Sequence, residues 1–200
     1  MGGRTAELPV LSGATLDSNH STTNYGTSQQ PRTRPAPGNH DYHTSGASAY
    51  YGYFGANAGP AGRGYYSYDL GNWHVVSLNS EISMPAGSAQ EQWLRGDLAA
   101  SNKPCAVAYW HKPRWTSSSG HGPSTSTGPL VQALYDYDAE LILTGHNHQY
   151  ERFAPQNPSG RLDNARGIRQ FVAGMGAPAS TASAPSSPTV RRATATPSVC

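Results

Sequence analysis

Short apolar runs, each ending in a polar turn, alternate along the chain with segments of helical periodicity. Alternating side chains from Tyr66 to Leu78, interrupted by the turn Leu70-Gly71-Asn72, predict a β-hairpin with one buried face. His74 lies inside its second strand, where we expect a structural histidine with satisfied partners. Apolar residues at helical spacing predict amphipathic helices over residues 88–100 and 129–137.

The remaining apolar runs are short enough to be buried strands. Two of them cover residues 106–110 and 141–144, and further strands are predicted over 149–153 and 168–173. A strand, a helix and a second strand in that order are typical of a βαβ unit, whose parallel strands end at one edge of a sheet. The sequence therefore predicts an α/β fold in which the turns after residues 110 and 144 lie on the same edge.

The length of 200 residues predicts one domain over 35–176, with an irregular lead-in over 1–34 and a flexible tail rich in Ala, Ser, Thr and Pro over 177–200. Charged residues make up only 13% of the chain, which also has 22 Gly and 16 Pro, so a loop-rich chain is expected rather than a helical bundle. The net charge is +2 and the basic residues are mostly scattered, which predicts no nucleic-acid partner. No run approaches the roughly 20 apolar residues that cross a bilayer, so no membrane segment is expected.

The two cysteines are too few for a cysteine-based metal site. Cys105 lies in an apolar run and is expected to be a small buried side chain, whereas Cys200 is expected to be free. The start of the chain leads into no apolar core of a signal peptide.

Candidate metal ligands follow two of the predicted strands. Gly145-His146-Asn147-His148 comes directly after the 141–144 run, and His111 follows the 106–110 run, which Pro113 prevents from continuing. Imidazole suits Zn, Fe, Mn or Ni, and histidines one residue apart on an extended turn can face two different ions. The alternative is a polar turn that carries surface histidines.

A compact polar corner, Gly38-Asn39-His40-Asp41, precedes these turns. Gly permits a tight turn, Asn offers a neutral oxygen ligand, His can donate a proton and Asp can orient that His. A plain polar turn is the alternative. The Ser- and Gly-rich loop over 116–128 carries His121 and is expected to be either a lid or a solvent-exposed connection.

Together, Gly38-Asn39-His40-Asp41, Trp110-His111-Lys112-Pro113-Arg114 and Gly145-His146-Asn147-His148 resemble, in order, the last three motif blocks of the calcineurin-like metallophosphoesterases. The resemblance covers about residues 31–176. In detail the chain looks most like the bacterial secreted branch near purple acid phosphatases, which implies a secreted or periplasmic location. The resemblance further implies a metallophosphoesterase-type β-sandwich flanked by helices, with one or two divalent metal ions (Zn, Fe, Mn or Mg).

The resemblance also implies a role for each matching residue. His40, oriented by Asp41, would contact the phosphate and could protonate the leaving oxygen. Arg114 would help hold the phosphate charge or else pack its turn. One metal ion would be bound by Asn39, His111 and His146, and the other by His148.

The chain departs from the family pattern upstream of Gly38, where neither the Asp-x-His block nor the Gly-Asp block is present. We therefore expect a fold truncated at the N-terminus, with an open sheet edge through which two copies could pair as a homo-oligomer. The first metal position would lack its bridging carboxylate. The second would keep only His148, unless a substitute ligand comes from Asp17, His20 or His43.

The first hypothesis for function is metal-dependent hydrolysis of phosphate monoesters, an alkaline-phosphatase-like activity in which metal-activated water attacks a small phosphoester substrate. One alternative is a phosphodiesterase, since the same groups serve both reactions. Another is a non-catalytic truncated fold that binds metal or phosphate. The sequence contains no Gly-x-Ser-x-Gly elbow of a serine hydrolase and no Gly-x-x-x-x-Gly-Lys-Ser/Thr loop of a nucleotide-driven enzyme.

Overall fold

The computed structural model describes residues 9–10 and 33–175. The predicted tail over 177–200 and most of the predicted lead-in over 1–34 lie outside the described residues, as do the candidate substitute ligands Asp17 and His20. These parts of the sequence analysis therefore stay predictions.

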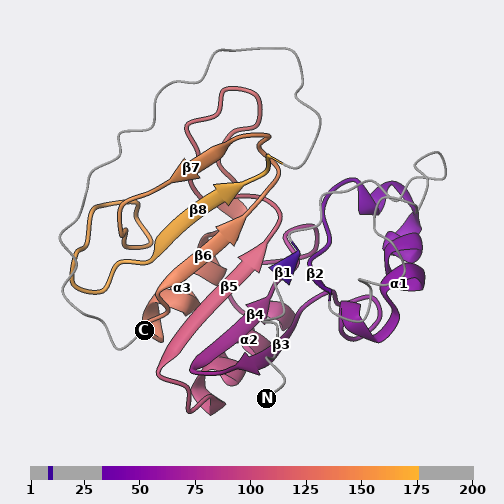
Figure 1. Ribbon diagram of the computed structural model, residues 1–200, viewed down its shortest axis with the longest axis horizontal. Coiled ribbons are helices and arrows are strands. Elements are labelled where there is room, and N and C mark those ends of the chain that lie inside the picture. Colours follow the sequence, from indigo (N-terminus) through magenta and orange to yellow (C-terminus); the bar gives the residue numbers. More distant parts are fainter. Residues whose placement is uncertain (1–8, 11–32, 176–200) are drawn as a thin grey trace, which may run out of the picture.

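A mixed sheet of six strands forms the centre of the protein, with the strand order β3-β4-β5-β6-β8-β7 (Figure 1). The four inner strands are parallel, whereas the edge strands β3 and β7 run antiparallel to their neighbours. The strands are β3 (Tyr66–Leu70), β4 (Trp73–Ser77), β5 (Cys105–Trp110), β6 (Leu141–Thr144), β7 (Tyr150–Arg152) and β8 (Arg169–Ala173).

The predicted α/β class and the predicted hairpin are confirmed. In place of two facing sheets, the described residues form this one large sheet and a short ladder. The ladder joins β1 (Pro9–Val10) to β2 (Arg34–Pro35) in parallel. β2 leads directly into the Gly38–Asp41 turn, which it places beside the large sheet.

Two helices cover one face of the sheet, and both were predicted. They are α2 (Ala89–Ala100) and α3 (Gly128–Asp136), and Ser88 caps α2 by accepting a hydrogen bond from the Glu91 amide. Their apolar sides bury the inward-facing residues of β4, β5 and β6, which include Val76, Trp110 and Ile142. Among the helices that the structure describes, none combines the length and the apolar content needed to span a bilayer.

A third helix, α1 (Ser48–Phe54), was not predicted. It follows 3₁₀ turns at Asp41–His43 and Ser45–Ala47 and precedes another at Gly55–Ala58. Tyr50 and Phe54 pack into a small cluster with two alanines, and Figure 1 shows this unit beside the sheet rather than on it. The unit supports the Gly38–Asp41 turn from outside the main core.

Cys105 is buried, as predicted, but its sulfur is part of a disulfide. Cys200, the only other cysteine in the sequence, lies outside the described residues.

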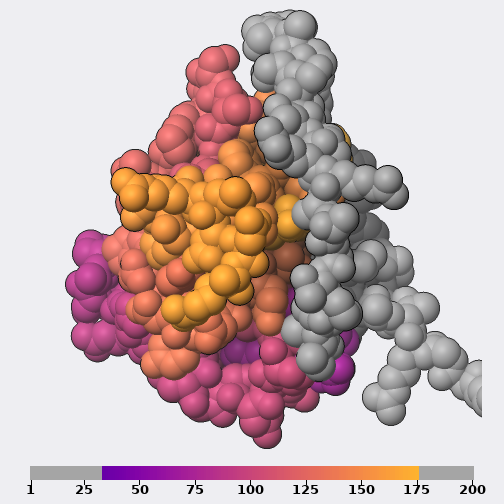
Figure 2. Space-filling model, turned by 90° about the vertical axis from the view of Figure 1, so that its left-hand side faces the viewer, coloured from indigo at the N-terminus to yellow at the C-terminus, as the bar shows by residue number. Residues whose placement is uncertain are grey.

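The predicted βαβ unit is formed by β5, α3 and β6, and β5 pairs with β6 in parallel. The turns after these two strands therefore meet at one edge of the sheet, as expected. The loop before α3 projects beyond that edge (Figure 1). In the view from the β7 side, the orange and yellow residues around β7 and β8 form much of the surface below this loop (Figure 2).

Candidate metal site

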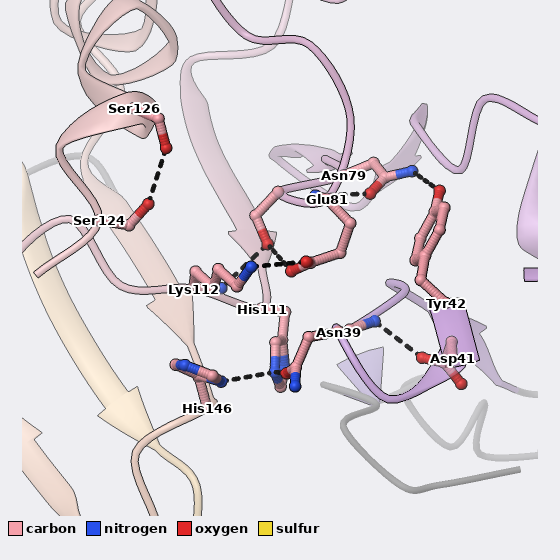
Figure 3. Close-up of polar contacts among 12 residues, drawn as sticks. Asn39, Asp41, Tyr42, Asn79, Glu81, His111, Lys112, Ser124, Ser126 and His146 are labelled. Carbon is pink, nitrogen blue, oxygen red and sulfur yellow. Dashed lines mark hydrogen bonds and ion pairs between the residues drawn. The ribbon is translucent and has the colours of Figure 1, made fainter. Parts of the chain in front are cut away.

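Three predicted ligands from three separate turns meet at the carboxyl edge of the sheet (Figure 3). His111 Nε2 lies 2.7 Å from Asn39 Oδ1 and 3.0 Å from His146 Nδ1. The Gly145 amide donates to the His111 carbonyl at 3.0 Å, which ties the two histidine turns together. We call Asn39, His111 and His146 the ligand trio.

The Gly38–Asp41 turn brings Asn39 into the trio. The Asp41 carboxylate accepts a hydrogen bond of 2.7 Å from the Gly38 amide, and the Asp41 amide donates to the Gly38 carbonyl at 3.1 Å. A Cβ atom on Gly38 would lie 2.8–3.0 Å from ring atoms of His111, closer than real side chains pack. The glycine therefore provides the space in which the turn approaches the imidazole.

Both histidines of the trio are neutral at pH 7. Burial is the main cause that lowers the pKa of His111 to about 3, and repulsion from the protonated form of His146 contributes to the shift. Burial likewise lowers the pKa of His146 to about 4, helped by His121 and Lys112. A neutral imidazole keeps a lone pair on one ring nitrogen, which is the form that binds a metal ion.

The spacing of the donor atoms fits a single divalent ion. Two ligands held at about 2.0–2.1 Å from one ion lie roughly 2.9–3.4 Å apart. The distance of 3.0 Å between His111 and His146 lies within this range, and the distance of 2.7 Å between His111 and Asn39 lies just below it. The trio consists of one amide oxygen and two imidazoles. In the part of the chain that the structure describes, no group of three or more His, Cys, Asp and Glu side chains is arranged to hold a metal ion.

His40 and His148, the two remaining candidate histidines, are exposed. The charge of His40 contributes to the lowered pKa of both trio histidines, and the charge of His148 contributes to that of His146. The ring of His43, the third candidate substitute ligand, lies 4.9 Å from that of His40. Among the described contacts, none joins His148 directly to the trio, so its predicted binding of a second ion stays a prediction.

The carboxylate of Asp41 has a different partner from the one predicted. It accepts from the Gly38 amide, and no described hydrogen bond joins it to His40. Burial raises the pKa of Asp41 to about 7; the Gly38 hydrogen bond lowers it in part and the charge of Glu81 raises it. In this structure Asp41 shapes the turn that carries His40.

Arg114 contacts neighbouring segments through both its side chain and its backbone amide. Its guanidinium donates to the Pro158 carbonyl at 3.5 Å and lies 3.9 Å from the position of a Cβ atom on Gly128. Its amide donates to the side chain of Gln170 at 3.1 Å. These contacts favour the second of its two predicted roles, packing of the turn.

Two residues without a predicted role lie beside the trio. The ring of His121 lies 4.3 Å from that of His146, and Lys112 forms an ion pair of 2.6 Å with Glu81 (Figure 3). Because Lys112 directly follows the candidate ligand His111, the sequence already indicated that it would lie beside the trio. No pattern in the Ser- and Gly-rich loop could have placed His121, because the loop has no regular periodicity.

Comparison with known proteins identifies the family of this chain. Residues 17–150 match the family described as Calcineurin-like phosphoesterase. Purple acid phosphatase 15 of Arabidopsis thaliana is 33% identical over 93 residues, which cover 44% of this chain and 18% of the relative. Probable inactive purple acid phosphatase 9 of the same plant is 32% identical over 103 residues, which cover 48% of this chain and 16% of the relative. The chain thus spans less than a fifth of the length of these two relatives.

A solved structure shows the same fold. Purple acid phosphatase PPD1 from yellow lupin (Lupinus luteus) seeds matches with a TM-score of 0.60 and 20% identity, over 72% of this chain and 31% of that chain. The family match covers more than half of the sequence and includes all three residues of the trio. The chain therefore belongs to the calcineurin-like phosphoesterase family and is related to the purple acid phosphatases.

Proposed function

We propose that this chain forms part of a metal-dependent phosphatase that hydrolyses small phosphate monoesters. It would supply the histidines of the active site. The observation that supports this proposal most strongly is the ligand trio: His111 Nε2 lies 2.7 Å from Asn39 Oδ1 and 3.0 Å from His146 Nδ1, and the three residues come from three distant turns. In the absence of a cation, His111 Nε2 cannot donate a hydrogen bond to Asn39 and accept one from His146 at the same time, because a neutral ring nitrogen carries either a proton or a lone pair. A cation would accept a lone pair from each of the three groups.

The residues of the candidate site divide into three groups. Asn39, His111 and His146 would hold a divalent cation, which supplies Lewis-acid activation of a phosphoester and of water when bound. His40 and His121 are exposed beside the trio and can donate protons to phosphate oxygens, and His40 can protonate the leaving oxygen. Lys112 adds positive charge, which its ion pair with Glu81 partly compensates.

Several finer points belong to the same proposal. We propose Zn, Fe, Mn or Mg as the metal, one or two ions per chain with His148 at the second, and a secreted or periplasmic location. A neutral-to-alkaline optimum follows if metal-activated water is the nucleophile, although both relatives described above are named acid phosphatases. A pH–rate profile distinguishes a neutral-to-alkaline optimum from an acid one.

Two alternatives have support of their own. A phosphodiesterase would use the same groups, and hydrolysis of bis(p-nitrophenyl) phosphate would identify it. A non-catalytic fold that binds metal or phosphate is favoured by the lack of a carboxylate in the trio and by the relative named as probably inactive. Without a bridging carboxylate, the positive charge of two ions would be poorly compensated.

The proposal is tested by metal content and turnover in the same preparation. We expect one or two ions per chain by elemental analysis and hydrolysis of p-nitrophenyl phosphate that a chelator abolishes. His146→Ala should lose the ion and lower kcat/KM by at least about a hundredfold, because a missing ligand opens the site. His43→Ala, which removes an exposed imidazole outside the trio, should keep the ion.

Retained activity in His146→Ala would refute the metal hypothesis. A bound ion without any turnover in the unmodified chain would instead favour the non-catalytic alternative. Loss of an ion in His43→Ala would identify His43 as the substitute ligand of the second position.

A further inference from the structure

Glu151 is a buried carboxylate on β7 for which the proposed reaction has no use. Its neighbours Tyr150 and Arg152 are exposed, whereas Glu151 is only 6% exposed. It accepts three hydrogen bonds from two consecutive residues of the loop that follows β5. Thr116 Oγ1 donates at 2.6 Å, the Ser117 amide at 2.7 Å and Ser117 Oγ at 2.5 Å.

The Thr116 hydroxyl extends this network to the His-x-His turn, beside the trio ligand His146. While it donates to Glu151, it accepts from Asn147 Nδ2 at 2.9 Å and from the Ser118 amide at 3.0 Å. Asn147 is 1% exposed and stands between His146 and His148 in the chain. One hydroxyl thus joins the β7 carboxylate, the His-x-His turn and the loop that leads to His121.

The His-x-His turn needs such support. His146 has a φ of 65°, in the left-handed region, which costs a non-glycine residue free energy and persists only where the surroundings fix it. The Asn147 amide donates to the Gly145 carbonyl at 2.8 Å, and its side chain is held by Thr116. The network therefore fixes the backbone directly beside the strained ligand.

The same network fixes the start of the loop that carries His121. Five residues after Thr116, the His121 ring lies 4.3 Å from the His146 ring. Later in the loop, the Ser124 amide donates to the Pro113 carbonyl at 2.8 Å. The loop is thus held on both sides of His121.

A carboxylate suits this position because every group around it donates. Burial raises the pKa of Glu151, but the hydrogen bonds from Ser117 and Thr116 lower it, and the net pKa lies below the usual range. An ionised carboxyl group only accepts hydrogen bonds, whereas an amide would present an NH₂ group to one of these donors.

We propose that Glu151 is a positioning residue, which acts through Thr116, Ser117 and Asn147 to hold His121 against His146 and to support the His-x-His turn. Its effect on turnover rests on the proposed function. The arrangement itself does not, because it can be measured in protein without metal.

The experiment compares Glu151→Gln with Glu140→Gln in the full chain. Glu140 is a matched control, since it also accepts a hydrogen bond from a backbone amide, that of Ala106 at 2.7 Å, but at the opposite end of the sheet. In chelated protein with ¹³C-labelled histidine, we expect a nuclear Overhauser effect between the His121 and His146 rings. Glu151→Gln should abolish it, and Glu140→Gln should keep it.

Turnover gives a second readout. With metal restored, Glu151→Gln should raise the KM for p-nitrophenyl phosphate about tenfold with a smaller change in kcat, because a displaced His121 weakens phosphate binding. A loss of folded protein would lower the apparent kcat at constant KM. If Glu151→Gln does not fold, Thr116→Val takes its place in the experiment, because this variant removes the shared hydroxyl.

Persistence of the ring contact in Glu151→Gln, or its absence from the unmodified chain, would overturn the proposal. Loss of the contact in Glu151→Gln without turnover in the unmodified chain would uphold the positioning role and count against the phosphatase function. The two hypotheses are therefore tested separately.

Discussion

At the scale of single residues, Gly38 controls the distance between the Asn39 turn and His111. A methyl group there would lie 2.8–3.0 Å from three ring atoms of His111, so the ring or the turn would have to move. Gly38→Ala should therefore separate Asn39 from the imidazole and destabilise the fold by about 1–3 kcal/mol, as overpacking does. Zinc affinity by calorimetry and the unfolding free energy in urea check both effects.

Gly52→Ala is the control for this substitution. Gly52 lies in α1, and a Cβ atom there would meet nothing within 4 Å. Alanine should be neutral or stabilising at this position by up to about 1 kcal/mol, because glycine is a poor helix former. Equal losses of zinc affinity in the two variants would argue against the close approach of Gly38 to His111.

Residue types and their order marked Asn39, His111 and His146 as candidate ligands, and the resemblance to the calcineurin-like metallophosphoesterases implied that they share one metal ion. The role of Gly38 as the space for an imidazole, and the contact of Asp41 with Gly38 rather than His40, could not be predicted. Both depend on atoms that are far apart in the sequence or on which neighbour a short side chain reaches. Such choices are decided by packing once the turn has formed.

At the scale of elements, His74 joins the β3–β4 hairpin to helix α2. Its Nδ1 lies 2.9 Å from Asp69 Oδ1 and its Nε2 lies 2.8 Å from Asp97 Oδ2. Ser67 Oγ also donates to Asp97 at 2.7 Å. The structural role expected for His74 is confirmed, since both ring nitrogens have a partner.

This contact should make stability depend on pH. The hydrogen bond to Asp97 raises the pKa of His74, burial opposes it, and Asp69 raises it further. Because the folded pKa exceeds the unfolded value near 6.5, the added stability is present below pH 6.5 and is lost as the pH rises through the folded pKa. His74→Gln should cost about 1 kcal/mol more at pH 6 than at pH 9 in urea unfolding. An equal cost at both values would contradict a charged His74.

Elements with a clear period were predictable, and α1 was not. Helices α2 and α3 carry apolar residues at helical spacing, and the inner strands are short apolar runs. The segment Ser48–Phe54 is rich in aromatic residues and contains Gly52. It therefore shows no clear helical spacing of apolar residues. Its helix is stabilised by the packing of Tyr50 and Phe54 against Ala47 and Ala58.

At the scale of the whole molecule, the sheet has two edges in the described residues, β3 and β7. β7 has only 3 residues and carries Glu151 and Arg152, features that limit pairing at that edge. Self-association through an open edge stays a prediction. Sedimentation velocity over a wide concentration range checks it: a dimer that forms with increasing concentration would support edge pairing, and a monomer throughout would contradict it.

The sequence by itself determined the α/β class, the order of the main elements and the three turns that carry Asn39, His111 and His146. These features are local, because periodicity, turn residues and the end of each strand depend on neighbours in the chain. Only the tertiary structure brought His121 to His146 and Glu151 to Thr116. Those contacts join segments that are far apart in the chain and that no sequence pattern links. Their distances depend on how the sheet, its helices and its loops pack together.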